Sequence, residues 1–488
     1  MRIKHLLSIA FIAIPLMASA QITIDETNFP DENFRNYLLE QDYGQDGVIT
    51  DEEIQSVFEI SVREKSITSL KGIEFFTELI FLDCYRNELT SLDVSNNIAL
   101  NSLICISNKL TSLDVSNNTA LTTLQLTSNN VRYIDVSKNT ALIELWCNDN
   151  GLTTLDISKN TALVSLRCDY NALTSLDISN NTALMYLMCH INQLSSLDLS
   201  KNTELCFLRC EENALTSLDV SNNTKLTSLF CYQNQIKGIT MDALIESLPS
   251  NEDEKYLYIF NNGDEGNICT KDQIATIKEK GWIPCYNNGK EYSGSTAPTT
   301  ISVSLPKNAL IAYCPAFDVR FGQSTRYEAY KASYSDGTVL LEKIESAVAG
   351  EGILLRSLSS RNTTVSLPIR EAEKNEGNAL VGTLNAAVLP ETDGNVTNFV
   401  LSTSDDGVSY FRKADNTPIA AWEAYLPIEN YNGTETISIV FDDETGIGDI
   451  KILPSADDDA FYTLSGVRVT TPTKGIYIKN GKKVYINQ

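Results

Sequence analysis

The sequence is poor in histidine and in basic residues. Only two histidines occur among 488 residues, and 63 aspartate and glutamate residues outnumber 38 lysine and arginine residues. His5 falls in an N-terminal segment that we expect to be removed, which leaves His190 as the sole imidazole. A single imidazole excludes a metal site built from several histidines and argues against most Ser-His and Cys-His mechanisms. The acidic balance repels phosphate backbones, so we expect no nucleic-acid partner.

The first 20 residues have the pattern of a secretory signal peptide. Arg2 and Lys4 precede an apolar stretch at residues 6–17, and residues 18–20 form an A-x-A cleavage site. The alternative, a membrane anchor, is disfavoured because the apolar stretch is too short to span a bilayer. No later segment is long and apolar enough to be a transmembrane segment. We therefore expect a secreted protein, extracellular or at the cell surface, with a mature net charge of about −27.

Internal repetition dominates the middle of the chain. Between residues 79 and 238 a 21-residue unit, L-x-x-L-x-C-x-x-N-x-L-T-x-L-D-V-S-x-N-T-A, occurs eight times in strict register. Three columns of this unit stand out: a leucine, a cysteine two residues later and an asparagine three residues beyond. Their members are Leu82, Leu103, Leu124, Leu145, Leu166, Leu187, Leu208 and Leu229; Cys84, Cys105, Leu126, Cys147, Cys168, Cys189, Cys210 and Cys231; and Asn87, Asn108, Asn129, Asn150, Asn171, Asn192, Asn213 and Asn234.

The first half of the unit resembles the leucine-rich-repeat signature L-x-x-L-x-L-x-x-N/C-x-L, with Cys in place of the third Leu. The resemblance implies an α/β-type solenoid with short parallel strands. Elementary physics agrees, because one unit cannot bury its apolar face whereas stacked units share a continuous core, with strands about 4.8 Å apart. The Asn column is expected to satisfy buried backbone groups. The Asp column (Asp93 to Asp219) and the Ser and Asn that follow it are interpreted as turn formers.

Eleven cysteines in a secreted protein would usually indicate disulfides. Seven of them occupy the repeat column, where Leu126 takes the eighth place without breaking the register. A small buried apolar side chain explains that exchange, whereas a covalent or metal-binding role does not. We therefore favour buried free thiols in the column. Cys269 and Cys285 lie outside it and are the best candidates for a disulfide.

An open solenoid end exposes its core, so each end needs a cover. Residues 21–65 are predicted to form the N-terminal cap, with helices at residues 33–40 and from residue 52 to about residue 58. Between them, residues 42–53 read D-Y-G-Q-D-G-V-I-T-D-E-E. This segment resembles an EF-hand loop, which has Asp first and fifth, Gly sixth, an aliphatic residue eighth and Glu twelfth.

The EF-hand resemblance implies a calcium ion as a cofactor. Its ligands would be the side chains of Asp42, Asp46 and Glu53 and the carbonyl of Val48, with Thr50 acting directly or through water. The sequence departs from the motif at its third position, where Gly44 supplies no side-chain oxygen. The alternative is a helix-loop-helix cap that binds no metal.

The rest of the chain is predicted to form a second cap, a β domain and a tail. Residues 239–294 read as a distorted continuation of the solenoid, with helices at 241–248 and 271–280 and strands at 256–260 and 282–286. Short strand-like runs between Gly, Asn and Asp turns then predict an all-β sandwich. The expected organisation is signal peptide 1–20, EF-hand-like helical cap 21–65, leucine-rich-repeat solenoid 66–238, solenoid cap 239–294, linker 295–300, β-sandwich 301–445 and tail 446–488.

The tail contains three short apolar runs that begin at Phe461, Lys474 and Gly481. It resembles the C-terminal segments of secreted Bacteroidales proteins and looks like a short form of the sorting domain read by type IX secretion. The alternative is a final β-hairpin module without an address function. The order of cap, Cys-type repeats, sandwich and tail also resembles secreted leucine-rich-repeat proteins of those bacteria and, more distantly, internalins.

Recognition is expected on the outward side chains of the strands, which would line a concave face. The inward columns barely change from unit to unit, whereas large aromatic residues and arginines replace Ser and Thr in the outward columns. Both residue types are enriched in binding hot spots, although drift on an unconstrained surface is the alternative. The predicted ligand-binding residues are Phe81, Asp83, Tyr85, Trp146, Arg167, Tyr170, Tyr186, Met188, His190, Phe207, Arg209, Phe230 and Tyr232.

Three functions were weighed on these grounds. The first is a monomeric extracellular or cell-surface protein that binds a protein or glycan with the concave face of its solenoid. The second is a structural or adhesion module in which the solenoid is a spacer and the sandwich makes the contacts. The third, an enzyme, is disfavoured because residues 301–445 contain no His and no nucleophile motif, so no catalytic residue is assigned.

Overall fold

The computed structural model describes residues 21–250, 254–261, 266–335, 337–404 and 407–442, and four short strands beyond residue 460. The chain divides into two compact units, residues 1–192 and 193–488. The expected signal peptide lies outside the described residues. Within the described part, no helix has both the length and the apolar character needed to cross a membrane.

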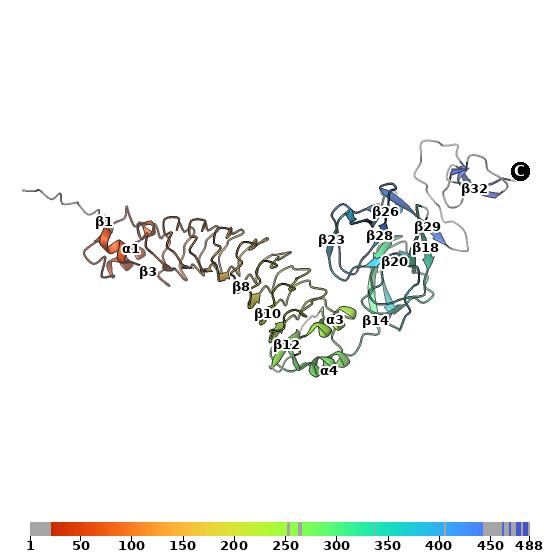
Figure 1. The fold of residues 1–488 in the computed structure, drawn as a ribbon, viewed down its shortest axis with the longest axis horizontal. Coiled ribbons are helices and arrows are strands. Elements are labelled where there is room, and N and C mark those ends of the chain that lie inside the picture. Colours follow the sequence, from red (N-terminus) through yellow and green to blue (C-terminus); the bar gives the residue numbers. More distant parts are fainter. Residues whose placement is uncertain are drawn as a thin grey trace, which may run out of the picture. The chain divides into compact units, whose positions relative to one another are not determined.

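The first unit begins with the helical cap. Its elements are the hairpin of β1 (Gln21–Thr23) and β2 (Val48–Thr50) and the helices α1 (Glu32–Leu39) and α2 (Asp51–Ser56). Figure 1 shows α1 and β1 beside the first coil of the solenoid. Phe29, Phe34 and Leu38 are fully buried, so the cap has an apolar core. Both predicted helices are confirmed, each beginning one residue earlier than expected.

Seven strands of the solenoid lie in the first unit, and each is three residues long. Neighbouring strands pair in parallel and in register, so that Leu82, Leu103 and Leu124 stack in one buried column. A single turn of 3₁₀-helix, η1 (Ile73–Phe75), belongs to the first coil. The strands are β3 (Glu59–Ser61), β4 (Phe81–Asp83), β5 (Ser102–Ile104), β6 (Thr123–Gln125), β7 (Glu144–Trp146), β8 (Ser165–Arg167) and β9 (Tyr186–Met188).

The second unit continues the parallel sheet to its last strand, giving eleven strands ordered β3 to β13. The cap at the C-terminal end of the solenoid contains two helices and two longer strands, as predicted. The turn after the last of these strands folds back along it, with Tyr292 N donating to Pro284 O at 2.8 Å. This turn covers an edge that would otherwise be open to pairing. The elements are β10 (Phe207–Arg209), β11 (Ser228–Phe230), α3 (Ile239–Ser247), β12 (Lys255–Phe260), α4 (Lys271–Glu279) and β13 (Trp282–Tyr286).

Two asparagine columns join the coils. The predicted column donates into the core: Nδ2 of Asn129 bonds the carbonyls of Cys105 and Leu126, each at 3.0 Å. The second column corrects a prediction, because these asparagines, interpreted as turn formers, are completely buried. In that column, Nδ2 of Asn139 donates to two carbonyls of the preceding coil, and the members are Asn97, Asn118, Asn139, Asn160, Asn181, Asn202 and Asn223. The exposed Asp column does form turns, as predicted.

The cysteine column is buried throughout. Cys84, Cys105, Cys147 and Cys168 are free thiols, which confirms the prediction for these four. Burial raises the pKa of Cys105 and of Cys147 to about 12, so neither ionises readily. The disulfide prediction for Cys269 and Cys285 is wrong: both are free. The Cys285 thiol instead donates to the carbonyl of Ile283 in its own strand.

An all-β domain follows, as predicted, and most of its strands form one mixed sheet of ten strands. β18 and β29 pair in parallel, and the bridge between Glu351 and Val381 brings the two ends of the sheet towards closure. The strands are β14 (Thr300–Leu305), β15 (Leu310–Tyr313), β16 (Val319–Arg320), β17 (Tyr327–Ser335), β18 (Thr338–Lys343), β19 (Ser346–Ala347), β20 (Ile353–Ser357), β21 (Thr363–Pro368), β22 (Val381–Gly382), β23 (Ala387–Leu389), β24 (Thr392–Asp393), β25 (Val396–Thr403), β26 (Ser409–Lys413), β27 (Thr417–Ile419), β28 (Ala424–Glu429) and β29 (Thr436–Asp442).

Two apolar cores lie on opposite faces of β17 and β20. On one face, Ala329 and Leu355 pack with β14, β16, β19 and β21. On the other face, Ala332 and Leu354 pack with β18, β25, β26, β28 and β29. Because successive side chains of a strand point to opposite faces, β17 and β20 are buried on both sides and join the two layers.

The tail contributes a four-stranded antiparallel sheet in the order β31-β30-β32-β33. Its strands are β30 (Phe461–Tyr462), β31 (Arg468–Val469), β32 (Gly475–Lys479) and β33 (Lys482–Ile486). The predicted small β tail is therefore present, and its role in secretion stays a prediction.

Candidate binding face

We call the outward side chains of the solenoid strands the strand face; in the first unit they belong to β4 to β9 and in the second unit to β10 to β12. Along each strand the buried leucine separates two outward positions, and a third outward position was expected immediately after the cysteine column. The first two positions are at least partly exposed in nearly every coil. The third position differs, because several of its members are buried, as described below.

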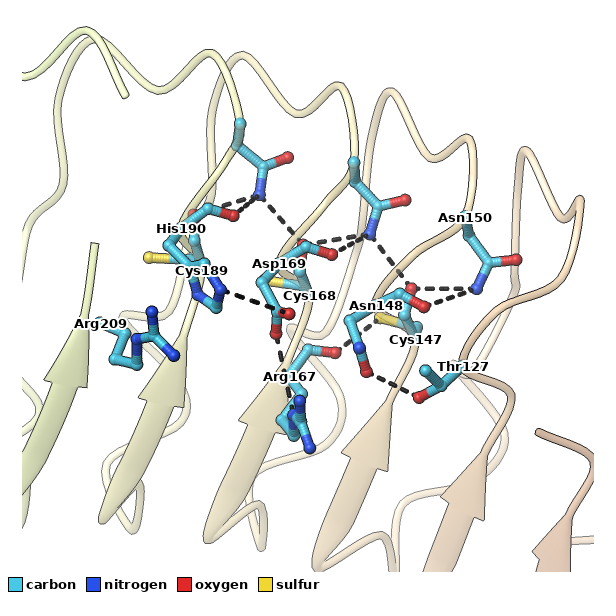
Figure 2. Close-up of polar contacts among 12 residues, drawn as sticks. Thr127, Cys147, Asn148, Asn150, Arg167, Cys168, Asp169, Cys189, His190 and Arg209 are labelled. Atoms are coloured by element: carbon cyan, nitrogen blue, oxygen red, sulfur yellow. Dashed lines mark hydrogen bonds and ion pairs between the residues drawn. The ribbon is translucent and has the colours of Figure 1, made fainter. Parts of the chain in front are cut away.

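Arg167 on β8 is the centre of the strand face in the first unit. Its guanidinium carbon lies 5.0 Å from the centroid of the Trp146 ring on β7, which is a cation–π contact. Its Nε lies 3.8 Å from Oδ1 of Asp169, whose side chain is only 2% exposed. Figure 2 shows Asp169 between Arg167, with which it forms an ion pair, and the imidazole of His190. The charges of this cluster are therefore largely compensated within it.

His190 does not project into solvent as the sequence analysis expected. Its side chain is 5% exposed, its Nε2 lies 3.7 Å from Oδ2 of Asp169, and the Tyr170 ring contacts its imidazole edge to face at 5.4 Å. The backbone explains the burial, because β9 ends at Met188, before the cysteine, and Ile191 has a left-handed φ of 51°. Tyr170 itself is half-exposed, so it is the member of this pair that a ligand can reach.

Two further predicted residues of the first unit, Tyr186 and Met188, lie on β9 beside the arginine. Tyr186 is exposed and Met188 is partly exposed. Trp146, Arg167, Tyr186 and Met188 thus come from three adjacent strands and share one face. In the same unit, Asn148 is buried and accepts a hydrogen bond from Thr127 Oγ1 at 2.7 Å, as Figure 2 shows.

A second arginine cluster lies at the start of the solenoid. Asp83 was predicted to contact ligand, but it is buried and accepts a hydrogen bond from Arg63 Nη1 at 3.1 Å. The Arg63 guanidinium lies 4.7 Å from the centroid of the Tyr85 ring. Phe81 and Tyr85 are partly exposed, as expected. Arg63 could not be predicted from the repeat, because it precedes the first unit and therefore belongs to no column.

The second unit carries a row of stacked aromatic rings. Phe207 and Phe230 have ring centroids 5.6 Å apart, and Phe230 and Tyr258 are parallel at 3.8 Å. Arg209 lies over Phe230 at 5.2 Å. Tyr258 on β12 was not predicted as a site residue, because the 28-residue step from Phe230 breaks the 21-residue period. The predicted site residues Phe207, Arg209 and Phe230 are all partly exposed.

Tyr232 is a further correction, because it is buried beside a buried carboxylate. Burial raises the pKa of Tyr232 to about 12, and the neighbouring Glu211 contributes in the same direction. Arg209 Nε donates to Glu211 Oε1 at 2.7 Å. Burial nevertheless raises the pKa of Glu211 above its ordinary value, although Arg209 acts in the opposite direction.

The residues predicted to bind calcium lie between the end of α1 and the first turn of α2, with Val48 and Thr50 in β2 and Glu53 in α2. Oδ1 of Asp42 accepts from Gln45, and Oδ1 of Asp46 accepts from Val48 N. Oε2 of Glu53 accepts from both N and Oγ1 of Thr50, completing a capping box at the start of α2. The three carboxylates therefore have separate partners, and the described residues include no cluster of three Asp, Glu, His or Cys side chains arranged to hold a metal.

The glycine at the third position of this loop has a packing reason. A Cβ on Gly44 would lie 2.2 Å from the carbonyl oxygen of Leu38, so a ligating side chain cannot be accommodated there. Calcium binding through Asp42, Asp46, Val48, Thr50 and Glu53 stays a prediction.

The solenoid has the leucine-rich-repeat fold. No model of a protein family matches the chain, and no curated protein matches it. Among solved structures, it is similar to the functional domain of InlJ from Listeria monocytogenes, which includes a cysteine ladder, with 22% identity, 73% of this chain and 100% of that chain covered, and a TM-score of 0.33.

Two other solved structures are similar to parts of the chain. A leucine-rich-repeat protein of Leptospira interrogans has 23% identity, with 48% of this chain and 68% of that chain covered and a TM-score of 0.40. The internalin InlF of Listeria monocytogenes has 20% identity, with 56% and 99% covered and a TM-score of 0.31. The assignment of the fold rests on this chain's own parallel strands and buried asparagine column.

Proposed function

We propose that this chain is an extracellular or cell-surface binding protein that uses the strand face of its solenoid to bind a protein or glycan. The observation that carries the proposal is the group Trp146, Arg167, Tyr186 and Met188 on β7, β8 and β9. The same positions on β5 and β6 hold smaller side chains, Ser102, Ile104, Thr123 and Gln125.

The physical argument is that these side chains give a large contact area at a small cost in entropy. Trp and Tyr have only two side-chain torsions, and the ring contact between Trp146 and Arg167 restricts both side chains before a ligand arrives. Exposed apolar groups would otherwise be a liability for solubility. Partly exposed, ordered aromatic residues on a rigid sheet therefore support binding rather than drift.

The test compares the full-length mature protein with Trp146→Ala/Tyr186→Ala. Both proteins are immobilised and probed in parallel with arrays of extracellular proteins and of oligosaccharides. Hot-spot residues contribute about 2 kcal/mol or more each, so we expect the captured signal to fall at least tenfold in the variant. The matched control is Tyr133→Ala, which removes an exposed aromatic side chain outside the strand face.

Two outcomes would count against the proposal. Equal capture by the double variant and the unaltered protein would indicate that the strand face is not used, and would favour the spacer function with contacts made by the β domain. A similar loss in Tyr133→Ala would indicate non-specific adsorption through exposed aromatic residues.

A further inference from the structure

Three arginines of the solenoid share one arrangement. Each pairs with a buried carboxylate and lies over an aromatic ring: Arg63 with Asp83 and Tyr85, Arg167 with Asp169 and Trp146, and Arg209 with Glu211 and Phe230. The three carboxylate side chains are at most 3% exposed, whereas the arginine side chains are 30% to 55% exposed. The arginine is therefore the exposed member of every triad.

An arginine next to a buried carboxylate can have a purely structural role, which is to neutralise the charge of that carboxylate. The geometry at Arg167 goes further than neutralisation requires. Nε lies 3.8 Å from Asp169, which is an ion-pair distance but too long for a hydrogen bond, and within the described part of the chain the two terminal Nη atoms make no hydrogen bond. Trp146 covers the guanidinium at 5.0 Å. The outer edge of the fork, with its four N–H groups, is thus left for an external acceptor.

This arrangement suits a carboxylate on the ligand. A guanidinium binds a carboxylate through two parallel N–H···O bonds, and those bonds are strongest when the fork is already oriented. Asp169 and the Trp146 ring supply that orientation, so less entropy is lost on binding. A chain with a net charge of −25 repels a polyanion. A single carboxylate that contacts the arginine is attracted to it, because salt screens the more distant negative charges of the chain but not a charge at contact distance.

The surroundings of Arg167 indicate that the carboxylate belongs to a polypeptide. Ile143 and Met185, which precede β7 and β9, are exposed, as is Tyr186 on β9. Backbone bonds from Val164 N to Ile143 O and from Met185 N to Val164 O place Ile143 and Met185 in the coils on either side of the Arg167 coil. Exposed apolar side chains in the coils that flank a charged group match a partner with apolar and acidic side chains, whereas a polyhydroxylated glycan gains little from them.

Resting on the proposed function, we infer that Arg167 is a carboxylate-binding subsite of the strand face, and that its partner is a protein segment with an acidic side chain flanked by apolar residues. Asp169 is its positioning residue, because it acts on the ligand only through Arg167. The subsite lies entirely on β7, β8 and β9, within the first unit.

The probe is a phage-displayed library of random linear peptides, selected on the full-length mature protein and on four variants: Arg167→Gln, Arg167→Lys, Arg132→Gln and Trp146→Ala/Tyr186→Ala. The unaltered protein is expected to enrich peptides with Asp or Glu next to apolar residues. Arg167→Gln should abolish the acidic enrichment while the apolar enrichment persists. Arg167→Lys keeps the charge but not the fork, so it should lower the affinity of selected peptides at least tenfold. Arg132→Gln, at an exposed arginine outside the strand face, should change nothing.

The outcomes separate this inference from the function it rests on. Peptides that depend on Trp146 and Tyr186 but contain no acidic residue would overturn the carboxylate subsite and leave strand-face binding in place. Selection of peptides indifferent to Trp146→Ala/Tyr186→Ala would contradict both, whereas selection of no peptide would contradict the polypeptide partner. If instead uronic- or sialic-acid oligosaccharides bind in an Arg167-dependent manner and no peptide does, the polypeptide partner is wrong. A thermal melt of each variant confirms that it remains folded.

Discussion

The two asparagine columns make an ordered prediction about stability: Asn129→Ala should destabilise the solenoid more than Asn139→Ala. The substitutions are chemically identical, and both side chains are buried in the first unit. They differ in how many hydrogen bonds the amide makes. Asn129 uses both ends of its amide, whereas Oδ1 of Asn139 has no partner among the described residues.

The magnitudes follow from these bonds. Removing the Asn129 amide leaves the buried N–H of Leu110 without an acceptor, at about 1–3 kcal/mol, and loses the bonds from Nδ2, at about 1 kcal/mol each. The total is about 4 kcal/mol. Asn139 loses two bonds, to Val115 O and Asn118 O, but both carbonyls keep a backbone partner. Because an unpaired acceptor is removed as well, its cost is about 1–2 kcal/mol.

The buried thiols provide a local assay. Cys105 and Cys147 flank both asparagines along the chain and are accessible to a thiol reagent only when the coils open. When the coils open and close faster than the reagent reacts, the labelling rate is proportional to the equilibrium population of the open state. A difference of about 2–3 kcal/mol in the free energy of opening then makes the cysteines of Asn129→Ala label about 30- to 150-fold faster than those of Asn139→Ala. Labelling at each cysteine is read by mass spectrometry.

Two exposed neighbours serve as controls. Asn130→Ala and Lys138→Ala sit beside the tested residues and should leave the labelling rates unchanged. Equal labelling rates for Asn129→Ala and Asn139→Ala, or the reverse order, would refute the idea that the number of hydrogen bonds made by each amide determines how much its column contributes to stability.

Three further predictions concern thiols, calcium and pH. Near neutral pH the native protein should show no labelling of Cys84 or Cys168, because burial raises the pKa of both thiols well above the ordinary value. Unfolding in urea should make both thiols reactive, and rapid labelling of the native protein would contradict the buried column. Calcium should raise the melting temperature of the N-terminal cap in the unaltered protein but not in Glu53→Gln; no calorimetric heat and no shift would end the calcium prediction. Because the pKa of Glu211 is raised on folding, the folded state binds its proton more tightly, so stability should fall as pH rises from about 4.5 towards the raised pKa. Glu211→Gln should remove that slope in urea-unfolding midpoints, and an unchanged slope would assign it to other groups.

The repeat was predictable because its columns have fixed chemical demands. One column holds Leu in all eight coils, and another holds Cys in seven coils and Leu126 in the eighth. Both patterns indicate an apolar site in the core. The second asparagine column carried the same signal of invariance, but Asp, Ser and Asn together are typical of turns. Composition therefore favoured the local interpretation, and the hydrogen bonds to preceding coils became visible only once the coils were stacked.

The candidate site was only partly predictable, because alternation holds only inside a strand. Asp169 and His190 follow the cysteine, where the strand has already ended, so the two-residue period no longer decides exposure. Their burial depends on large neighbours in adjacent coils, such as the Tyr170 ring over His190. Pairings between distant segments, including the parallel contact of β18 with β29, likewise leave no mark in the local pattern.

The asparagine bonds also bear on how such a chain can change over generations. Asn118, Asn139 and Asn160 each reach carbonyls that lie 24 and 21 residues earlier. Losing or gaining one whole unit recreates the same bonds, whereas any other length leaves buried amides facing the wrong partners. Duplication or deletion of complete units is therefore the inexpensive path for this gene, and each such event adds or removes one strip of the strand face. The solenoid can acquire recognition surface in steps of fixed size without redesigning its core.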